Sequence, residues 1–201
     1  MTFALKRALD FLIAVPLLLL LSPLIVLIAV LVKVTSRGPI LFCQKRLGRD
    51  LVLFTMLKFR TMVDNAERTG TGLFSYQDDP RITWMGRILR RTSLDELPQL
   101  FNVIAGSMSI VGPRPPVSYE LGDPATFDAP TRARFRVRPG ITGLAQVSGR
   151  NELEWPEKIV KDNEYIDLLF QRGIVVDFAI LFKTALIVTC MRNIIEPRRG
   201  G

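Results

Sequence analysis

The chain has 201 residues, of which 48% are hydrophobic and 23% are charged, and its formal net charge is +8. Its mean hydropathy of +0.25 is high for a soluble domain, whereas the charged residues need water, so the composition favours a membrane-associated protein with one globular domain. There is no histidine, which excludes Ser–His and Cys–His catalytic pairs and imidazole-ligated zinc, and the positive charge favours an anionic partner.

The first predicted element is an uncharged apolar segment, Phe11 to Val32, which is long enough to cross a bilayer as a helix. Ser22 and Pro23 lie in its middle. The proline removes a backbone donor, which predicts a kink or a break, and Ser22 can satisfy a freed backbone group. The alternative is an ordinary spanning helix that tolerates its proline.

Basic residues flank this segment on both sides, so the positive-inside rule selects no orientation. A re-entrant helix resolves this, because both basic flanks then lie on the cytoplasmic face near anionic lipid. We therefore expect residues 1–34 to form a re-entrant membrane helix broken at Ser22 and Pro23. Residues 35–201 are expected to form a cytoplasmic domain docked on the membrane surface.

The next elements are two strand-like stretches, ILFCQKR from Ile40 and LVLFTMLKF from Leu51, joined by a glycine-containing loop. They predict a β-hairpin, the only sheet that the pattern supports. The polar stretch from Asp64 to Asp79 predicts a mobile loop or a short helix. Cys43 and Cys190 form neither a metal motif nor a disulfide framework, so we expect small buried side chains in a reducing compartment.

The rest of the chain is predicted to be helical, with two rigid or turn-rich loops. The expected helices are Ile82–Leu89, one beginning at Ser93, Thr131–Arg136 and Glu157–Phe170, and the expected loops are 111–117, with three prolines, and 138–143. The last apolar segment, Ile174–Ile195, contains Asp177 and Lys183, and predicts either a helix in the membrane interface or a plain core helix. The expected fold is mainly α with a small β-hairpin (α+β), with a re-entrant membrane helix and interfacial amphipathic helices.

The densest group of charged residues is Arg90 to Leu100. Ser93 and Glu96 have the spacing of a capping box, which makes Ser93 the expected N-cap and places Asp95 and Glu96 in the first turn, where acidic residues are ordinary. The functional interpretation is that a carboxylate at the positive end of a helix, beside arginines, stays ionised near a phosphate. Such a carboxylate is a candidate nucleophile, and two adjacent carboxylates also suit Mg²⁺.

Further cations recur in the predicted loops, including Lys58 and Arg60 after the hairpin and Arg150 near the second loop. A solvated basic face is the usual explanation for scattered charges. Arg114 is the exception, because its proline neighbours stiffen the backbone and reduce the entropy that its guanidinium loses when it grips a phosphate.

Several motifs in order now resemble one family. SLDELPQLFNVIAGSMSIVGPRP, together with KFRTM (Lys58 to Met62), RPGITGLAQVSGRN (Arg138 to Asn151) and KRALDFLIAVPLLLLLSPL near the N-terminus, closely resembles the bacterial sugar transferase family, the monotopic polyprenyl-phosphate phosphoglycosyl transferases. The likeness extends from Lys6 to about Lys183. The short length resembles the minimal catalytic form, which lacks the multi-spanning N-terminal region of larger members.

The resemblance implies a two-step transfer of a sugar-1-phosphate from a UDP-sugar to polyprenyl (undecaprenyl) phosphate. The aspartate that matches Asp95 attacks the sugar-linked phosphate, UMP leaves, and the covalent phospho-sugar passes to the lipid. The resemblance assigns Glu96 an assisting role through metal or proton handling, and it implies Mg²⁺ held by Asp95 and Glu96. It also implies the first membrane step of a bacterial glycoconjugate pathway, such as exopolysaccharide or lipopolysaccharide synthesis, on the cytoplasmic face of the inner membrane.

The same resemblance suggests substrate-binding residues. Lys58, Arg90 and Arg114 match family positions, and Arg60, Gln146 and Arg150 are candidates by motif membership only. The pair Ser22 and Pro23 matches the helix-breaking pair of a re-entrant segment, and Asp177 weakly matches an acidic residue of the C-terminal helix. The transferred sugar, the pathway and homo-oligomerisation remain open.

Two other interpretations compete with this one. The first is a bitopic membrane scaffold with a phosphate-binding cytoplasmic domain, in which Asp95 and Glu96 only cap a helix. The second is a membrane-anchored nucleic-acid binder, suggested by charge alone. Because the sequence contains no recognisable nucleic-acid module, we expect no nucleic-acid partner.

Overall fold

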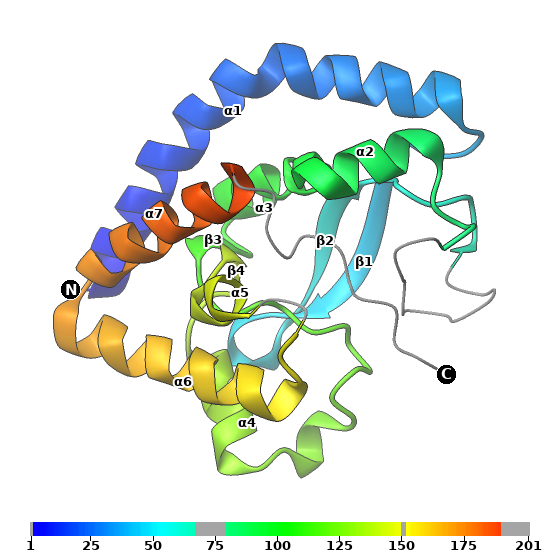
Figure 1. Cartoon of the computed structure of the whole chain (residues 1–201). Helices are drawn as coiled ribbons and strands as arrows, with labels where there is room; N and C mark the ends of the chain where they lie inside the picture. The colour runs from blue at the N-terminus through cyan, green and yellow to red at the C-terminus, as the bar shows by residue number, and fades with distance from the viewer. Residues whose placement is uncertain (1, 67–78, 150–151, 190–201) are drawn as a thin grey trace.

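The computed structural model describes residues 2–66, 79–149 and 152–189. Its helices surround two small sheets, and one long helix, α1 (Thr2–Thr35), runs along one side of the molecule (Figure 1). The predicted fold class, mainly α with a β-hairpin and an apolar N-terminal helix, is confirmed. The stretch from Asp64 to Asp79, predicted as a loop or short helix, lies largely outside the described residues.

Helix α1 contains two prolines, Pro16 and Pro23, and it bends in its middle part while remaining one helix (Figure 1). Pro23 cannot donate to the carbonyl of Leu19, four residues earlier. The hydroxyl of Ser22 donates to that carbonyl at 2.8 Å. The helix is therefore bent and is not broken at Ser22 and Pro23, and Ser22 satisfies the acceptor that Pro23 leaves.

Helix α1 is also the one described helix that is long and apolar enough to cross a membrane, since Phe3–Thr35 reaches a hydropathy of 3.0. Only 11% of that apolar window is buried inside the molecule. A core helix of a soluble protein would be mostly buried, so the exposure of α1 fits contact with lipid.

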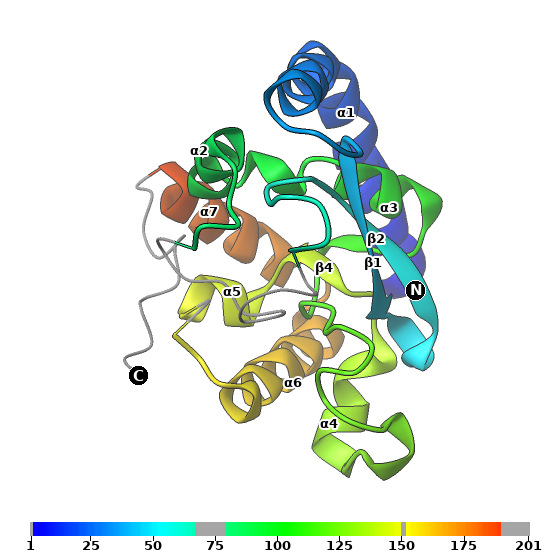
Figure 2. The same ribbon diagram turned by 90° about the vertical axis from the view of Figure 1, so that its right-hand side faces the viewer.

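The predicted β-hairpin is confirmed. Strands β1 (Leu41–Leu47) and β2 (Leu53–Phe59) pair antiparallel, and the connection contains Gly48 and the short 3₁₀ helix η1 (Arg49–Leu51). Figure 2 shows the hairpin as a twisted ribbon beside α3. The prediction that Cys43 is buried was wrong: it is exposed, because alternate residues of a strand face opposite sides and its neighbour Gln44 takes the buried side. Cys190 lies outside the described residues.

The second sheet was not predicted from the sequence. Strands β3 (Ser109–Val111) and β4 (Gly140–Thr142) pair in parallel, although residues 138–143 were expected to form a loop. Three-residue strands show no alternation that a sequence pattern could reveal. A side chain on Gly140 would lie 2.1 Å from the backbone nitrogen of Gly112, so glycine is required where the two chains meet.

The predicted helices are found close to their expected positions. They are α2 (Trp84–Thr92), η3 (Leu94–Glu96), α3 (Gln99–Ala105), α4 (Ala129–Ala133), η5 (Arg134–Arg136), α6 (Trp155–Arg172) and α7 (Val175–Thr189). Two further short helices, η4 (Pro124–Thr126) and α5 (Leu144–Ser148), were not predicted. Helix α7 combines features of both alternatives that were predicted for the last apolar segment. Ile180 faces the core, whereas Phe178, Phe182 and Leu186 are exposed, so α7 has a core face and an exposed apolar face.

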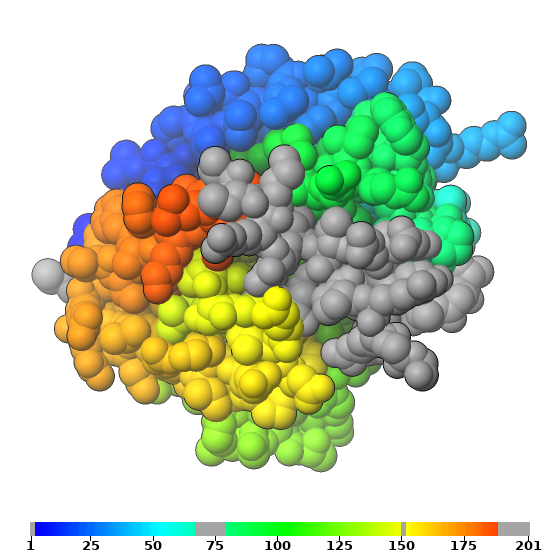
Figure 3. All heavy atoms as spheres, in the orientation of Figure 1, coloured from blue at the N-terminus to red at the C-terminus, as the bar shows by residue number. Residues whose placement is uncertain are grey.

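Two hydrophobic clusters form the core, and α1 contributes to both. Ala14 packs with residues of α3, β3, α6 and α7, whereas Ile28 and Val32 pack with Phe59 of β2 and with Met85 and Leu89 of α2. Figure 3 shows α1 lying against the rest of the molecule along its length. The apolar helix is thus packed onto the globular part at both halves.

Candidate active site

The hairpin and the short helix η3 bring a lysine and two carboxylates together. Lys58 Nζ, on β2, donates to Glu96 Oε1, on η3, at 2.7 Å. Arg114 Nη1 lies 3.5 Å from the same oxygen. Glu96 therefore links strand β2 to the proline-rich loop 112–116, and three of the predicted site residues share one ion-pair network.

Asp95 is the most enclosed member of this group, with 9% of its surface exposed. Burial raises the pKa of its carboxyl above the ordinary value, and the charge of Glu96 acts in the same direction. The cations Lys58, Arg90 and Arg114 act in the opposite direction, and Lys58 has the largest of these effects. The sequence-based expectation was that the helix end and the arginines keep Asp95 ionised. It did not include burial, whose effect on the pKa is larger than that of the arginines.

Lys58 responds to the same surroundings. Burial lowers the pKa of its ammonium group, and the neighbouring cation Arg114 adds to this effect, whereas Glu96 and Asp95 raise the pKa. The pKa values of Lys58 and Asp95 therefore depend on the charges of their neighbours in this cluster. A negatively charged phosphate would favour the charged form of Lys58.

Arg90 and Arg114 approach the carboxylates from different elements. Arg90 lies in the last turn of α2, and its Nε donates to Thr61 Oγ1 at 2.9 Å. Arg114 stands between prolines, as the sequence analysis emphasised, with 39% of its side chain exposed. An exposed guanidinium on a stiff backbone can grip a phosphate with little loss of entropy.

The predicted capping box at Ser93 was wrong. Ser93 ends α2 in a left-handed conformation, with φ of 57°, and its side chain makes no capping hydrogen bond to η3. Glu96, its expected partner, is instead bonded to Lys58. The sequence spacing was correct for a box, but the tertiary ion pair uses the glutamate.

The described residues contain no cluster of three or more Cys, Asp or Glu side chains that could hold a metal ion. The neighbouring carboxylates of Asp95, which is buried, and Glu96, which is partly buried, are nonetheless hard oxygen donors. Mg²⁺ commonly takes one or two protein carboxylates and completes its shell with water and substrate phosphate oxygens. The residues present fit that mode of binding.

Arg60 and Gln146 do not take part in this ion-pair network. The structure does not bring Arg60 to the cluster, because its guanidinium is bonded to the end of α1. Gln146, in α5, has buried side-chain nitrogen and oxygen atoms without hydrogen-bond partners. Arg150 lies outside the described residues. Asp177 accepts from Lys6 at 2.6 Å and from the Tyr165 hydroxyl at 2.8 Å, so it ties α7 to α1 and α6.

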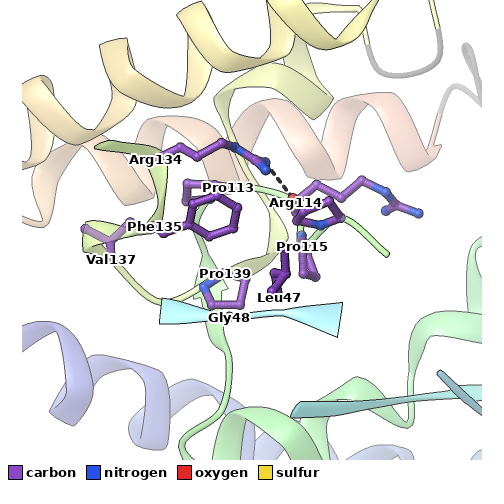
Figure 4. A pocket seen from close by; sticks show the side chains of 10 residues that line it. Leu47, Gly48, Pro113, Arg114, Pro115, Arg134, Phe135, Val137 and Pro139 are labelled. Atoms are coloured by element: carbon purple, nitrogen blue, oxygen red, sulfur yellow. Dashed lines mark hydrogen bonds between the residues drawn. The ribbon is translucent and has the colours of Figure 1, made fainter. Parts of the chain in front are cut away.

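The Arg114 loop is held by residues that the sequence pattern did not predict. Arg134 Nη2 donates to the Arg114 carbonyl at 2.7 Å, as Figure 4 shows, and also to Asp162 Oδ2 at 2.7 Å. Both charged side chains are almost fully buried. Beside them lies a cavity of about 10 Å³, lined by the proline loop and by Leu47, Phe135 and Val137. It has room for about one water molecule and not for a substrate.

Comparison with known proteins gives the same assignment as the motifs. The family model described as bacterial sugar transferase matches residues 1–191. Exopolysaccharide production protein ExoY of Sinorhizobium fredii is 41% identical over 202 residues, covering 94% of this chain and 87% of the relative.

Two further relatives are named after the lipid carrier. Undecaprenyl-phosphate glucose phosphotransferase of Komagataeibacter xylinus is 46% identical over 169 residues, covering 80% of this chain and 32% of the relative. Undecaprenyl-phosphate galactose phosphotransferase of Salmonella typhimurium is 41% identical over 199 residues, covering 92% of this chain and 40% of the relative. The chain belongs to the bacterial sugar transferase family.

Proposed function

We propose that this sugar-phosphate transferase moves a sugar-1-phosphate from a UDP-sugar to undecaprenyl phosphate and releases UMP, with Asp95 as the nucleophile. The observation that carries the proposal is the buried Asp95 beside Glu96, with Lys58, Arg90 and Arg114 close enough to affect its pKa. Relatives named as undecaprenyl-phosphate glucose and galactose phosphotransferases support the choice of donor and acceptor.

In the first step, a carboxylate oxygen of Asp95 attacks the sugar-linked phosphorus. A bond forms between this oxygen and phosphorus, the bond from phosphorus to the bridging oxygen breaks, and UMP leaves with that oxygen. A carboxylate is a weak nucleophile and the target is an anion, so the step needs cations that neutralise charge. Lys58, Arg90 and Arg114 are placed to do this, and Glu96 holds two of them.

In the second step, a phosphate oxygen of the lipid attacks the same phosphorus. The bond to Asp95 breaks, the carboxylate is regenerated, and the product is an undecaprenyl diphosphate sugar. We further propose that Mg²⁺, held by Asp95 and Glu96, supplies additional neutralisation of phosphate charge when bound.

The membrane part of the proposal concerns α1. Its N-terminal half bonds the globular part through Lys6 and Asp177, and its C-terminal end does so through Arg60. A helix that crossed the hydrocarbon core would separate these ends by about 30 Å of lipid. Contacts of both ends with one globular part support a re-entrant helix, with the active site on the cytoplasmic face of the inner membrane.

The test is intact-protein mass spectrometry after incubation with a UDP-sugar and Mg²⁺ but without lipid acceptor. A panel of UDP-glucose, UDP-galactose and a UDP-amino-sugar covers the sugars at issue. We expect one sugar-phosphate adduct on the wild type and none on Asp95→Asn, which keeps the side-chain size. Glu96→Gln should form the adduct more slowly.

An adduct mapped to another residue would move the nucleophile there. If the wild type shows no adduct yet makes product once undecaprenyl phosphate is added, transfer is direct, and Asp95 is then a metal ligand. A wild type that neither exchanges UMP with UDP-sugar nor forms product would instead favour the bitopic scaffold.

A further inference from the structure

Arg60 forms an unusual end to the apolar helix α1. Its guanidinium is buried, with 5% of the residue exposed, and its Nη2 donates to the carbonyl and to the hydroxyl of Ser36 at 2.7 Å each. Its Nη1 donates to the carbonyl of Arg37. Its Nη2 also donates to the carbonyl of Val32, in the last turn of α1, at 3.5 Å. The last carbonyls of a helix have no partner within the helix and favour a nearby cation, so Arg60 stabilises the end of α1 by hydrogen bonding and by charge.

The other caps of this helix end come from α1 and the turn that follows it. Thr35 Oγ1 donates to the Leu31 carbonyl at 2.6 Å, Ser36 Oγ to the Val32 carbonyl at 3.1 Å, and Lys33 Nζ to the Gly38 carbonyl at 3.3 Å. These bonds stabilise the helix end but tie it to nothing else. Arg60 differs because it comes from the hairpin, 24 residues further along the chain from Ser36.

Arg60 directly follows strand β2, and its chain neighbours contact the active site. Lys58, two residues before it, donates to Glu96 at 2.7 Å. Thr61, the next residue, accepts from Arg90 Nε at 2.9 Å. One short segment therefore bonds the end of α1, Glu96 and Arg90.

We propose that Arg60 is a positioning residue that couples the exit of the membrane helix α1 to the Lys58–Glu96 ion pair and Arg90. This assignment deepens the proposed function and rests on it. It differs from direct substrate binding. To bind substrate, Arg60 would have to leave the end of α1, and the carbonyls of Ser36 and Arg37 would then lose their hydrogen-bond donor.

Gly38 offers a second way to break the same contact without touching Arg60. Its φ is +119°, which a side chain rarely adopts, and a Cβ there would lie 1.9 Å from Arg60 Nη1. Gly38→Ala should therefore displace the guanidinium. Gly122→Ala is the matched control, because Gly122 has a comparable φ of +86° but no atom within 4 Å of its added Cβ.

The experiment compares the full-length wild type with Arg60→Gln, Arg60→Lys, Gly38→Ala and Gly122→Ala in nanodiscs of phosphatidylethanolamine and phosphatidylglycerol. Kinetics use undecaprenyl phosphate with UDP-glucose or UDP-galactose, whichever the wild type accepts. Spin labels at positions 34 and 52, both exposed, report the distance between the end of α1 and the hairpin loop. Cys43 and Cys190 are replaced by serine in every protein.

We expect Arg60→Gln and Gly38→Ala to broaden the distance distribution and to lower kcat about 10- to 100-fold, the range for a small misplacement of catalytic groups. The KM for the UDP-sugar should change by less than about threefold, since uniform substrate binding is intact. The kcat of Arg60→Lys should lie between those of the wild type and Arg60→Gln, because one ammonium group cannot replace the several donors of a planar guanidinium. Gly122→Ala should match the wild type.

A rise of tenfold or more in the KM for the UDP-sugar, with an unchanged distance distribution, would overturn the proposal and make Arg60 a substrate ligand. Wild-type kinetics and distances in Arg60→Gln would overturn it as well. If the wild type itself transfers no sugar phosphate, the proposed function fails. The spin-label distances still decide whether Arg60 fixes α1, and an unchanged distribution in both variants would refute that.

Discussion

Asp95, the proposed nucleophile, shows how burial and neighbouring charges together set the pKa of one carboxyl group. Its carboxyl is buried, which raises its pKa, and three cations limit that rise. The proposed attack on phosphorus requires the ionised form. The group that lowers its pKa most, Lys58, is itself buried and has a lowered pKa, so two coupled groups must carry opposite charges at the same pH.

The first prediction is a bell-shaped pH dependence of kcat/KM for the UDP-sugar. On the acid side, activity should fall at a pH above the ordinary aspartate pKa of about 3.9, because the raised pKa keeps Asp95 protonated up to a higher pH. It should also fall on the basic side below about 10.4, because Lys58 loses its proton early. Initial rates of UMP release measure both limbs.

Lys58→Arg is the control for this profile, because an arginine keeps its charge across the range. It should remove the basic limb and leave the acid limb in place. A basic limb that survives in Lys58→Arg would have to come from another group.

The raised pKa of Asp95 also predicts how stability depends on pH. Between the unfolded and the folded pKa of Asp95, the folded protein binds a proton that the unfolded chain has lost, so stability falls as the pH rises through this range. Asp95→Asn should therefore have a thermal midpoint at pH 8 no lower than that of the wild type.

The second prediction concerns Arg134, whose side chain donates a hydrogen bond to the carbonyl of Arg114. Arg134→Met leaves Asp162 buried and unpaired, and breaking such a pair costs about 3–5 kcal/mol of folding free energy. Burial already raises the pKa of Asp162, and Arg134 is the main group that opposes this. Denaturant unfolding in detergent measures the loss.

The double variant Arg134→Met with Asp162→Leu separates stability from function. Two apolar side chains should restore most of the lost free energy, because a buried ion pair and a packed apolar pair are often of similar stability. Activity should stay low, since the Arg114 carbonyl has still lost its donor. A fully active double variant would show that Arg134 does not position Arg114.

The site residues differ in how far the sequence could predict them. Asp95 and Glu96 were predictable because neighbouring carboxylates and a specific motif share one segment, and Lys58 belongs to a second motif. Arg60 belongs to that same motif, yet its guanidinium lies at the end of α1. The partner of Arg134 is 28 residues away, on α6. Tertiary packing decides which partner a long side chain contacts, and a sequence pattern does not contain the tertiary packing.

At the scale of elements, long periodic segments were predictable and short ones were not. Helix α6 and the β1–β2 hairpin have clear patterns and were confirmed. Strands β3 and β4 have three residues each and lie next to proline and glycine, so their pairing arises from the close approach of Gly112 and Gly140. Local propensity does not predict such a parallel pair, because its partners are about 30 residues apart and both lie in irregular segments.

The third prediction concerns the bend of α1. Pro23→Ala restores a backbone donor for the Leu19 carbonyl, so the helix should straighten and its C-terminal end should lose contact with Arg60. We expect activity to fall about tenfold, as for other misplacements of catalytic groups. Spin labels at the two ends of α1 should move apart.

Ser22→Ala is the matched control for that bend. It removes the hydroxyl that bonds Leu19, at a cost of about 1 kcal/mol, but keeps the proline that causes the bend. The distance between the labels should stay close to that of the wild type. Equal distances in Pro23→Ala and the wild type would show that packing against α2 and α3, rather than the proline, bends the helix.

At the scale of the whole molecule, α1 is bonded to the globular part near both ends. Arg7 donates to the carbonyls of Val103 and Ile104, and Asp10 accepts from Ser109 and Ile110. These contacts lie near the N-terminus of α1, whereas Arg60 binds the other end. The exposed apolar side chains of α1 face water unfavourably, which agrees with membrane association of this helix.

The fourth prediction follows from these two attachments: positions 2 and 37, before and after the apolar segment, lie on the same side of the membrane. Thr2→Cys and Arg37→Cys are made singly with Cys43 and Cys190 replaced by serine, and spheroplasts are treated with an impermeant maleimide. We expect neither position to react in intact spheroplasts and both to react after permeabilisation. A protein that retains Cys43 alone, exposed on the hairpin, reports the side of the globular part. If one end alone reacts in intact spheroplasts, α1 spans the membrane, and the polar contacts of its two ends with one globular part could not both form in the bilayer.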